Sequence, residues 1–302
     1  FHHRIAAGPS DKLIRIHGFN VPPGENGHFV QSKDGSKYTE DEMDAIRTFA
    51  VSRRLILILE EFIGKPIRWQ WFGDGSNDPL QIYIRNSGIN SSYRRSQKCI
   101  ELDYYGPYKD WTYYCRSVDI VAHETGHAIL DGLKPNWYDA DIETRGIAEA
   151  FCDFCAMLLV TTNMDLCDEV IQETGGNYKR SSILSLFGAG YGFDDNPHSC
   201  IRNAINTSQF DLGVSTVYDY GELLIGFLYD VVTDRSMKKT SMDKEPAKSL
   251  FEAAIPWAKA IVTSILSCND QKTTMREFLF HFQNNFPDDE IVKRSLKARN
   301  LL

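Results

Sequence analysis

Two histidines four residues apart, with a glutamate directly after the first, constrain this chain more than any other feature. They are His123 and His127, with Glu124 between them, in an apolar stretch of helical periodicity. Residues at i and i+4 project from one face of a helix, so both imidazoles can bind one metal ion. Glu124 is rotated by about 100° from His123, which places its carboxylate beside the metal. The motif therefore predicts a metal-binding helix with a general base next to the metal.

Chance alone seldom produces such a motif in a chain of this size. With 8 histidines in 302 residues, some His-Glu-x-x-His motif is expected in about 1 chain in 100. The alternative is an amphipathic helix whose two histidines are satisfied by ordinary hydrogen bonds. The motif by itself leaves both interpretations open, so the other ligands of a metal site must be sought elsewhere in the chain.

A second pair of polar residues at helical spacing supplies them. A catalytic zinc site needs a third protein ligand and one open position. Glu149 can complete a set of two histidines and one glutamate, and Asp153, four residues later, can accept the second ring N–H of a liganding histidine. An exposed acidic helix face is the alternative. Apolar neighbours on all sides predict a buried helix instead, and buried carboxylates need partners.

The segments 119–128 and 146–153 together resemble the thermolysin-like gluzincin zinc metallopeptidases. In that family the helix after the two-histidine motif carries a glutamate ligand and, four residues later, an aspartate that orients a histidine. Both match here, at Glu149 and Asp153. The stretch between His127 and Glu149 is slightly longer than in the family's type member, which implies an insertion in the intervening turn. Outside residues 119–153 the match is weak.

The resemblance implies further roles, each with a structural alternative. Tyr218 stands where the family has a histidine that donates to the oxyanion, and a phenol can donate there too. Tyr138 matches a tyrosine that assists the oxyanion, and Arg202 an arginine that braces the substrate carbonyl. Asp119, outside the ligand set, matches a position that can hold structural calcium, although the acidic cluster that would complete such a site is not evident.

The order of predicted elements favours an α+β fold. Expected strands lie at residues 67–72, 80–84 and 99–105, and expected helices at 39–62, 117–132, 143–162, 216–234, 244–267 and 273–285. This order predicts a zincin-like architecture, with a small mixed β-sheet and helices in the N-terminal half and a mainly α-helical C-terminal half. We expect an α+β lobe at residues 1–132 that ends in the active-site helix. A mainly helical lobe at 133–302 would carry the third zinc ligand, with the active site in the cleft between.

Charge and composition exclude some partners. The net charge of −8 and the lack of a long Lys/Arg tract argue against a nucleic-acid partner. The uninterrupted apolar runs fall short of the roughly 20 residues of a membrane span, so no membrane span is predicted. Seven cysteines without regular spacing favour mostly free thiols in a soluble chain. Residue 1 is Phe rather than Met, so a signal or pro-segment absent from this chain would be invisible, and both intracellular and secreted locations stay open.

The expected function is zinc-dependent hydrolysis of peptide bonds through a zinc-bound water activated by Glu124, which later delivers the proton to the leaving amine. A peptide or protein substrate would lie extended along the sheet edge. The absence of a Gly-x-Met-x-Asn signature, typical of gluzincin aminopeptidases, favours an endopeptidase. Two alternatives remain: a zinc-binding pseudoenzyme or partner-binding module without turnover, and a helical interaction protein in which the motif is accidental.

Overall fold

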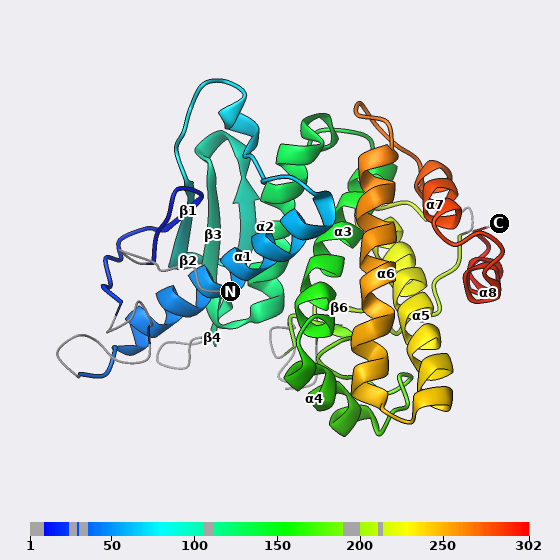
Figure 1. Ribbon diagram of the computed structural model, residues 1–302. Coiled ribbons are helices and arrows are strands. Elements are labelled where there is room, and N and C mark those ends of the chain that lie inside the picture. Colours follow the sequence, from blue (N-terminus) through cyan, green and yellow to red (C-terminus); the bar gives the residue numbers. More distant parts are fainter. Residues whose placement is uncertain are drawn as a thin grey trace.

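A small β-sheet lies beside a larger set of helices (Figure 1). The computed structural model describes residues 9–23, 29, 36–105, 112–189, 200–210 and 214–301. Within these residues there are eight α-helices, five of them after residue 162, so the fold is α+β with a mainly helical C-terminal half. The strands are β1 (Ile14–Ile16), β2 (Leu80–Arg94), β3 (Cys99–Tyr105), β4 (Thr112–Tyr113), β5 (Leu186–Phe187) and β6 (Arg202–Asn203). The α-helices are α1 (Glu40–Ile63), α2 (Val118–Leu133), α3 (Ile142–Thr161), α4 (Met164–Thr174), α5 (Val217–Asp243), α6 (Pro246–Ser267), α7 (Met275–Asn284) and α8 (Glu290–Ala298).

Strand β2 folds back and lies on both sides of β3. Ile82 in its first half and Tyr93 in its second half both pair with Ile100. The first half follows β3 in the same direction, and residues 91–94 follow it in the opposite direction. β1 pairs with the first half of β2, and β4 pairs antiparallel with the end of β3. Residues 91–94, which we call the edge segment, therefore form an outer strand of a mixed sheet.

Helix α1 begins and ends where its sequence predicts. The Thr39 hydroxyl accepts the N–H of Glu42, and the Glu42 carboxylate accepts the N–H of Thr39 at 2.7 Å, which together form a capping box. At the other end, Gly64 takes the left-handed conformation with φ 74° and closes the helix. The predicted helix at 39–62 is thus confirmed to within one residue at each end.

The strand predicted at residues 67–72 was wrong. Part of this segment is a 3₁₀ helix, Gln70–Phe72, and none of it pairs in the sheet. The indole N–H of Trp69 donates to the Leu13 carbonyl at 2.7 Å, and Trp69 is fully buried. The Arg68 carbonyl lies against Gly132 of α2, where any Cβ would clash with it. The aromatic run therefore fills the space between the sheet and α2 instead of adding a strand.

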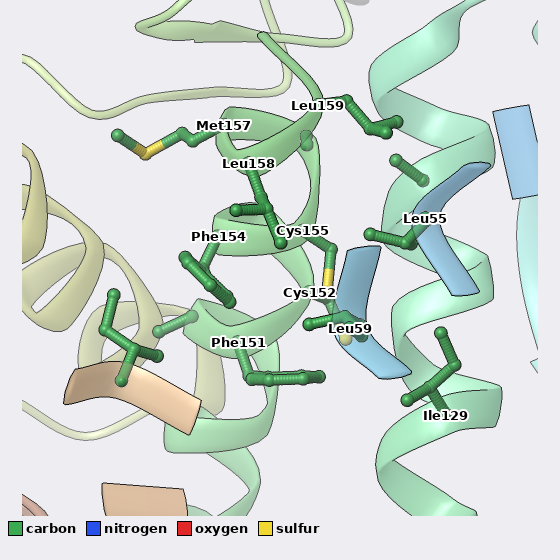
Figure 2. Close-up of a cluster of buried hydrophobic side chains, with 14 of the residues drawn as sticks. Leu55, Leu59, Ile129, Phe151, Cys152, Phe154, Cys155, Met157, Leu158 and Leu159 are labelled. Atoms are coloured by element: carbon green, nitrogen blue, oxygen red, sulfur yellow. The ribbon is translucent and has the colours of Figure 1, made fainter. Parts of the chain in front are cut away.

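One hydrophobic core joins the two halves of the chain, with α2 and α3 at its centre. Gly126 lets these helices approach closely, because a Cβ there would lie 3.1 Å from the Cys155 Sγ. Figure 2 shows Cys152 and Cys155 on the side of α3 that faces Leu55 and Leu59 of α1. All the cysteines are free thiols, as predicted, and those of α3 are fully buried. The spacing of Cys152 and Cys155, with two residues between them, is also found in redox and zinc pairs, but here it places two small side chains where α3 packs closely on α2.

Several boundaries differ from the prediction. Strand β2 continues ten residues beyond the predicted end at residue 84, and α5 continues to Asp243 rather than ending near residue 234. Helices α4 and α8 were not predicted. The proposed boundary between lobes, after residue 132, falls one residue before the end of α2. The existence of two separately folding lobes stays a prediction.

Helix α6 is long and apolar enough to cross a membrane by length and composition alone, which the inspection of uninterrupted apolar runs missed. Helices α3 and α4 together meet the same criterion, but the chain bends by 97° between them. Most of the apolar stretch of α6 is buried inside the structure. A core helix of a globular protein has the same properties, and α6 packs on α5, α4 and α7.

A buried carboxylate ties the sheet to α1 and predicts a large loss of stability when it is neutralised. Asp44 is fully buried and accepts Nε–H of Arg85 and of Arg116, each at 3.0 Å. Asp44→Asn removes the buried counter-charge of both guanidinium groups and leaves them only the exposed carboxylates of Asp41 and Glu40. We expect it to lower the free energy of unfolding by about 2–3 kcal/mol. Asp41→Asn is the matched control, because Asp41 also contacts Arg85 but is 59% exposed; it should cost at most about 0.5 kcal/mol. Urea unfolding followed by circular dichroism measures both, and equal losses would contradict this prediction.

Candidate metal centre

A cleft with a cavity volume of about 990 Å³ opens between the edge segment, α2, α3 and the start of α5. Its position, between the sheet and the C-terminal helices, is where the sequence places the active site. All nine residues predicted for the site line this cleft: Asp119, His123, Glu124, His127, Tyr138, Glu149, Asp153, Arg202 and Tyr218. The fold therefore brings together residues that span a hundred positions of sequence.

The two histidines of α2 direct the same ring nitrogen toward one point. The helix begins at the Ser117 cap, and its periodicity places His123 and His127 one turn apart on the face toward α3. Their Nε2 atoms lie 3.1 Å apart, and the rings are nearly perpendicular. Two nitrogens at this separation can bind the same metal ion.

The Glu149 carboxylate and the two ring nitrogens form a triangle of donor groups, which we call the donor triangle. Helix α3, capped by Asp141, places Glu149 so that one oxygen lies 3.4 Å from Nε2 of His123 and the other 3.5 Å from Nε2 of His127. Zinc held at about 2.0–2.1 Å in a tetrahedral arrangement has ligand atoms about 3.3 Å apart. The three separations between these groups are close to this length, and the carboxylate contacts each histidine through a different oxygen. The three side chains thus have the spacing of a tetrahedral metal site in which the fourth coordination position is free.

Asp153 and Arg202 hold His123 from its other side. Asp153 accepts Nδ1 of His123 at 2.8 Å, which leaves Nε2 as the nitrogen available to a metal. Arg202 of β6 donates to Asp153 through Nε at 2.8 Å and through Nη2 at 2.7 Å. The predicted role of Asp153 in orienting a histidine matches this geometry. Arg202 braces Asp153, and its contact with a substrate carbonyl stays a prediction.

The charges around the triangle favour a cation. Burial opposes ionisation of Glu149, but the two histidines and Arg202 hold the pKa of its carboxyl well below the usual range. Burial lowers the pKa of His127, so this ring is neutral and can ligate. Burial and the Arg202 charge disfavour a proton on His123, yet its hydrogen bonds to Asp153 and Glu149 raise its pKa to about 10. The acids thus stabilise positive charge at the donor triangle.

Glu124 is held beside the donor triangle by the edge segment. It is 7% exposed, and its carboxylate accepts the N–H of Tyr93 at 2.8 Å. Since this N–H points away from β3 and toward α2, the outward side of the edge segment faces the cleft. This hydrogen bond fixes one oxygen of Glu124. The other oxygen is left to accept a proton.

A buried cluster that the sequence analysis missed supports Tyr138. Asp131, one turn after His127 on α2, accepts the hydroxyl of Tyr93 at 2.6 Å and Nε–H of Arg95 at 3.0 Å. The Arg95 guanidinium stacks on the Tyr138 ring, 4.2 Å from its centroid. Tyr138 remains 41% exposed in the cleft. The sequence does contain one signal, because Asp131 follows His127 by four residues and so shares its helix face. Its partners, however, come from the second half of β2 and the residue after it, which no local spacing links to Asp131.

Tyr218 and Glu149 are positioned by a close contact between α3 and α5. Gly221 of α5 lies where a Cβ would come within 3.0 Å of the Glu149 Cβ, and Gly146 of α3 lies against Tyr220. Glycine at both points lets the helices cross closely. Tyr218, in the first turn of α5, is 62% exposed and lines the cleft. Its phenol therefore reaches the same space as the donor triangle.

Asp119 has a structural role in this fold. One carboxylate oxygen accepts the Ser117 hydroxyl and the other accepts the N–H of Gly188. Gly188 follows β5, whose partner β6 carries Arg202. Asp119 thus tethers the hairpin that braces Asp153, and structural calcium there stays a prediction. From the sequence, the glycine-rich stretch at residues 188–197 is also expected to form a flexible rim or an internal linker, but residues 190–199 lie outside the described residues.

Two other groups of side chains compete as metal sites. The donor atoms of His123, His127 and Cys152 lie within 4.8 Å of one another, but burial raises the pKa of the Cys152 thiol well above its usual value, and the ligating form is the thiolate. Glu149, already ionised, is the better third ligand. The donor atoms of a second group come equally close to one another: Cys268, Glu277 and His281.

This second group is less suited to a cation. The Glu277 oxygens already accept the Asn269 N–H at 2.8 Å and the Thr273 hydroxyl at 3.1 Å. The Lys134 ammonium lies 2.6 Å from the Cys268 carbonyl oxygen, which places a positive charge beside the group. Burial also raises the pKa of the Cys268 thiol to about 11. We therefore assign the donor triangle of the cleft as the stronger candidate.

Comparison with models of known protein families gave no match, and no curated protein matches the sequence. The interpretation of the cleft therefore depends on the geometry and chemistry of its own residues.

Proposed function

We propose that this protein is a zinc-dependent metallopeptidase, an endopeptidase of the gluzincin type with a zincin-like fold. The observation that carries the proposal is the convergence of His123, His127 and Glu149 beside the buried carboxylate of Glu124. The two Nε2 atoms lie 3.1 Å apart, and the two Glu149 oxygens lie 3.4 and 3.5 Å from one of them each. Two histidines, one glutamate and an open face form one of the ligand sets of catalytic zinc.

The donor set fits zinc in chemistry as well as in spacing. Two imidazoles in the neutral form and one carboxylate suit a borderline metal, and a metal ion would displace the proton that His123 carries without it. Asp153 supplies the usual second partner of a ligating histidine. Zinc bound there supplies a Lewis acid that polarises the scissile carbonyl and lowers the pKa of a water molecule. In this proposal, Glu124 takes a proton from the attacking water and delivers it to the leaving amine. Tyr138 and Tyr218, which line the same cleft, donate to the oxyanion.

The cleft also suits an extended peptide. The outward side of the edge segment lies against the cleft, so main-chain groups of a substrate can pair with it as an added strand. Three exposed apolar residues line the same space, namely Tyr138, Tyr218 and Ile201, which is 46% exposed. Exposed apolar side chains around a cavity are typical of a surface that binds polypeptide.

A zinc-binding protein without turnover is the second candidate, and one observation favours it. The resemblance places a histidine donor where this chain has Tyr218, and in the part of the chain that the structure describes the Tyr218 phenol has no hydrogen-bond partner to orient it. A donor without such a partner contributes less to catalysis, because orientation must be fixed before the reaction. Turnover distinguishes the two functions.

The test is metal-dependent proteolysis by the purified chain. We expect about one zinc per chain by elemental analysis, cleavage of an unfolded protein and of a peptide library, loss of cleavage with a chelator, and recovery on adding zinc. Zinc without cleavage of any substrate would favour the pseudoenzyme. A chain that holds no zinc after incubation with the metal would contradict both candidates.

Tyr138 and Arg95 should act as one unit. Tyr138→Phe removes the donor, and we expect kcat/KM to fall about tenfold, at the low end of the effect of an oxyanion donor. Arg95→Ala removes the stacking partner of the ring and should cost a similar factor. Because both act through one phenol, the double variant should be little worse than either single one. Arg15→Ala is the control, since Arg15 is exposed on β1 and does not line the cleft. Additive losses would show that Arg95 does not position Tyr138.

A further inference from the structure

We propose that Arg145 forms a carboxylate-binding subsite of the cleft, which selects peptides that present an acidic side chain or a free C-terminus at this point. The inference rests on the proposed function, because it assumes that a peptide occupies the cleft. It goes beyond that function in naming the charge of a preferred substrate.

Arg145 shares the cleft face of α3 with the proposed metal ligand. It lies in the first turn of the helix, three residues before Ala148 and four before Glu149, and all three line the cleft. Residues at these spacings project from one helix face, and four residues correspond to about 6 Å along the axis. Arg145 is exposed, and the short side chain of Ala148 lies between it and Glu149. Its guanidinium is therefore within reach of a substrate residue close to the scissile bond.

The other cations that line the cleft are already neutralised. Lys134 is 2% exposed, pairs with Asp270 and donates to the Cys268 carbonyl oxygen. Arg202 donates twice to Asp153. Arg145 has no ion pair with any residue that the structure describes. Of the lysines and arginines described around the cavity, Arg145 is thus the one whose charge remains for a ligand.

The acids near the start of α3 have partners of their own. Asp141 caps the helix through the Thr144 N–H at 3.0 Å, and Glu143 accepts the Met275 N–H at 2.7 Å. Asp139, also in the cleft, lies 4.0 Å from a nitrogen of Arg95. These carboxylates thus have partners, and none of the ion pairs among the described residues joins one of them to Arg145.

The chemistry of this position favours a carboxylate. A guanidinium binds carboxylates through two parallel N–H groups, and the partial positive charge at the start of α3 adds to its attraction. A lysine or arginine of the substrate would be repelled at the same point. The rest of the cleft is rich in acids, which favour positively charged groups of a substrate. The unpaired arginine instead favours a negatively charged group at this one subsite.

Peptide binding to the Glu124→Gln chain, loaded with zinc, tests the proposal without turnover. Peptides that carry Glu or Gln at each position in turn are compared by calorimetry, each with a free and with an amidated C-terminus. We expect a preference of about three- to fivefold for one carboxylate over its amide, as for a charge-assisted contact at an exposed position. A Glu/Gln difference identifies a side chain as the source, and a free/amidated difference identifies the terminus.

Two variants then assign the preference to Arg145. Arg145→Ala should remove it and leave the amide peptides within twofold, and Arg145→Glu should turn it into a preference for Lys. Raising the salt concentration should weaken it in the unsubstituted chain. Arg276→Ala is the control, because Arg276 is exposed on α7 and does not line the cleft.

The result decides this inference separately from the peptidase itself. An unchanged ratio in Arg145→Ala, or no discrimination in the first place, would overturn the subsite even if peptides are cleaved. A preference that depends on Arg145 in a chain that cleaves nothing would support the subsite and overturn the peptidase. Failure to bind any of the peptides would overturn both.

Discussion

Glu124→Gln should lower the rate of peptide hydrolysis about a thousandfold or more while leaving the zinc content unchanged. The amide has nearly the same shape, and its oxygen can still accept the Tyr93 N–H that now binds the carboxylate at 2.8 Å. It cannot take a proton, and general-base catalysis is worth about 10²–10⁴ in rate. Since Glu124 lies outside the donor triangle, its replacement should leave the metal ligands in place.

The measurement is kcat/KM on one peptide, with zinc determined by elemental analysis on the same samples. Glu169→Gln is the matched control, because Glu169 is exposed on α4, away from the cleft. It should keep full activity. A Glu124→Gln chain that retains more than a tenth of the activity would assign the base elsewhere. One that loses its zinc would show that Glu124 acts as a ligand or supports one.

The residues of the candidate centre could be named from sequence because each lies at a helical spacing from another. His123 and His127 share a face of α2, Glu149 and Asp153 share a face of α3, and the caps at Ser117 and Asp141 fix where these helices begin. Local periodicity was sufficient to place each pair. Their convergence also needs the two helices to pack closely at Gly126, which no local pattern specifies.

The features that the sequence analysis missed depend on contacts between distant segments. The cluster of Tyr93, Arg95 and Asp131 exists because β2 folds back on β3, and the strand predicted at residues 80–84 ends before that reversal. Residues 67–72 have strong strand propensity, but burial of Trp69 against the sheet and α2 outweighs it. Tertiary packing decided both cases.

The bound metal should be lost from His127→Ala and retained by His281→Ala. Both histidines belong to groups whose donor atoms come within 4.8 Å of one another, so the pair of variants decides which group holds the ion. Removing one of three protein ligands should lower the zinc affinity by several orders of magnitude, because the remaining two must share the ion with solvent. We expect about one zinc per chain in the unsubstituted protein and in His281→Ala, and almost none in His127→Ala.

The third ligand is decided by a second pair of variants, Glu149→Ala and Cys152→Ala. The carboxylate lies 3.4 and 3.5 Å from the two ring nitrogens and is ionised, whereas burial keeps the neighbouring thiol protonated. Zinc should therefore be lost with Glu149 and kept without Cys152. The opposite pattern would mean that metal binding deprotonates the thiol despite its burial, and the proposed ligand set would be wrong. Retention in both would leave only the histidines as ligands, an incomplete set for catalytic zinc.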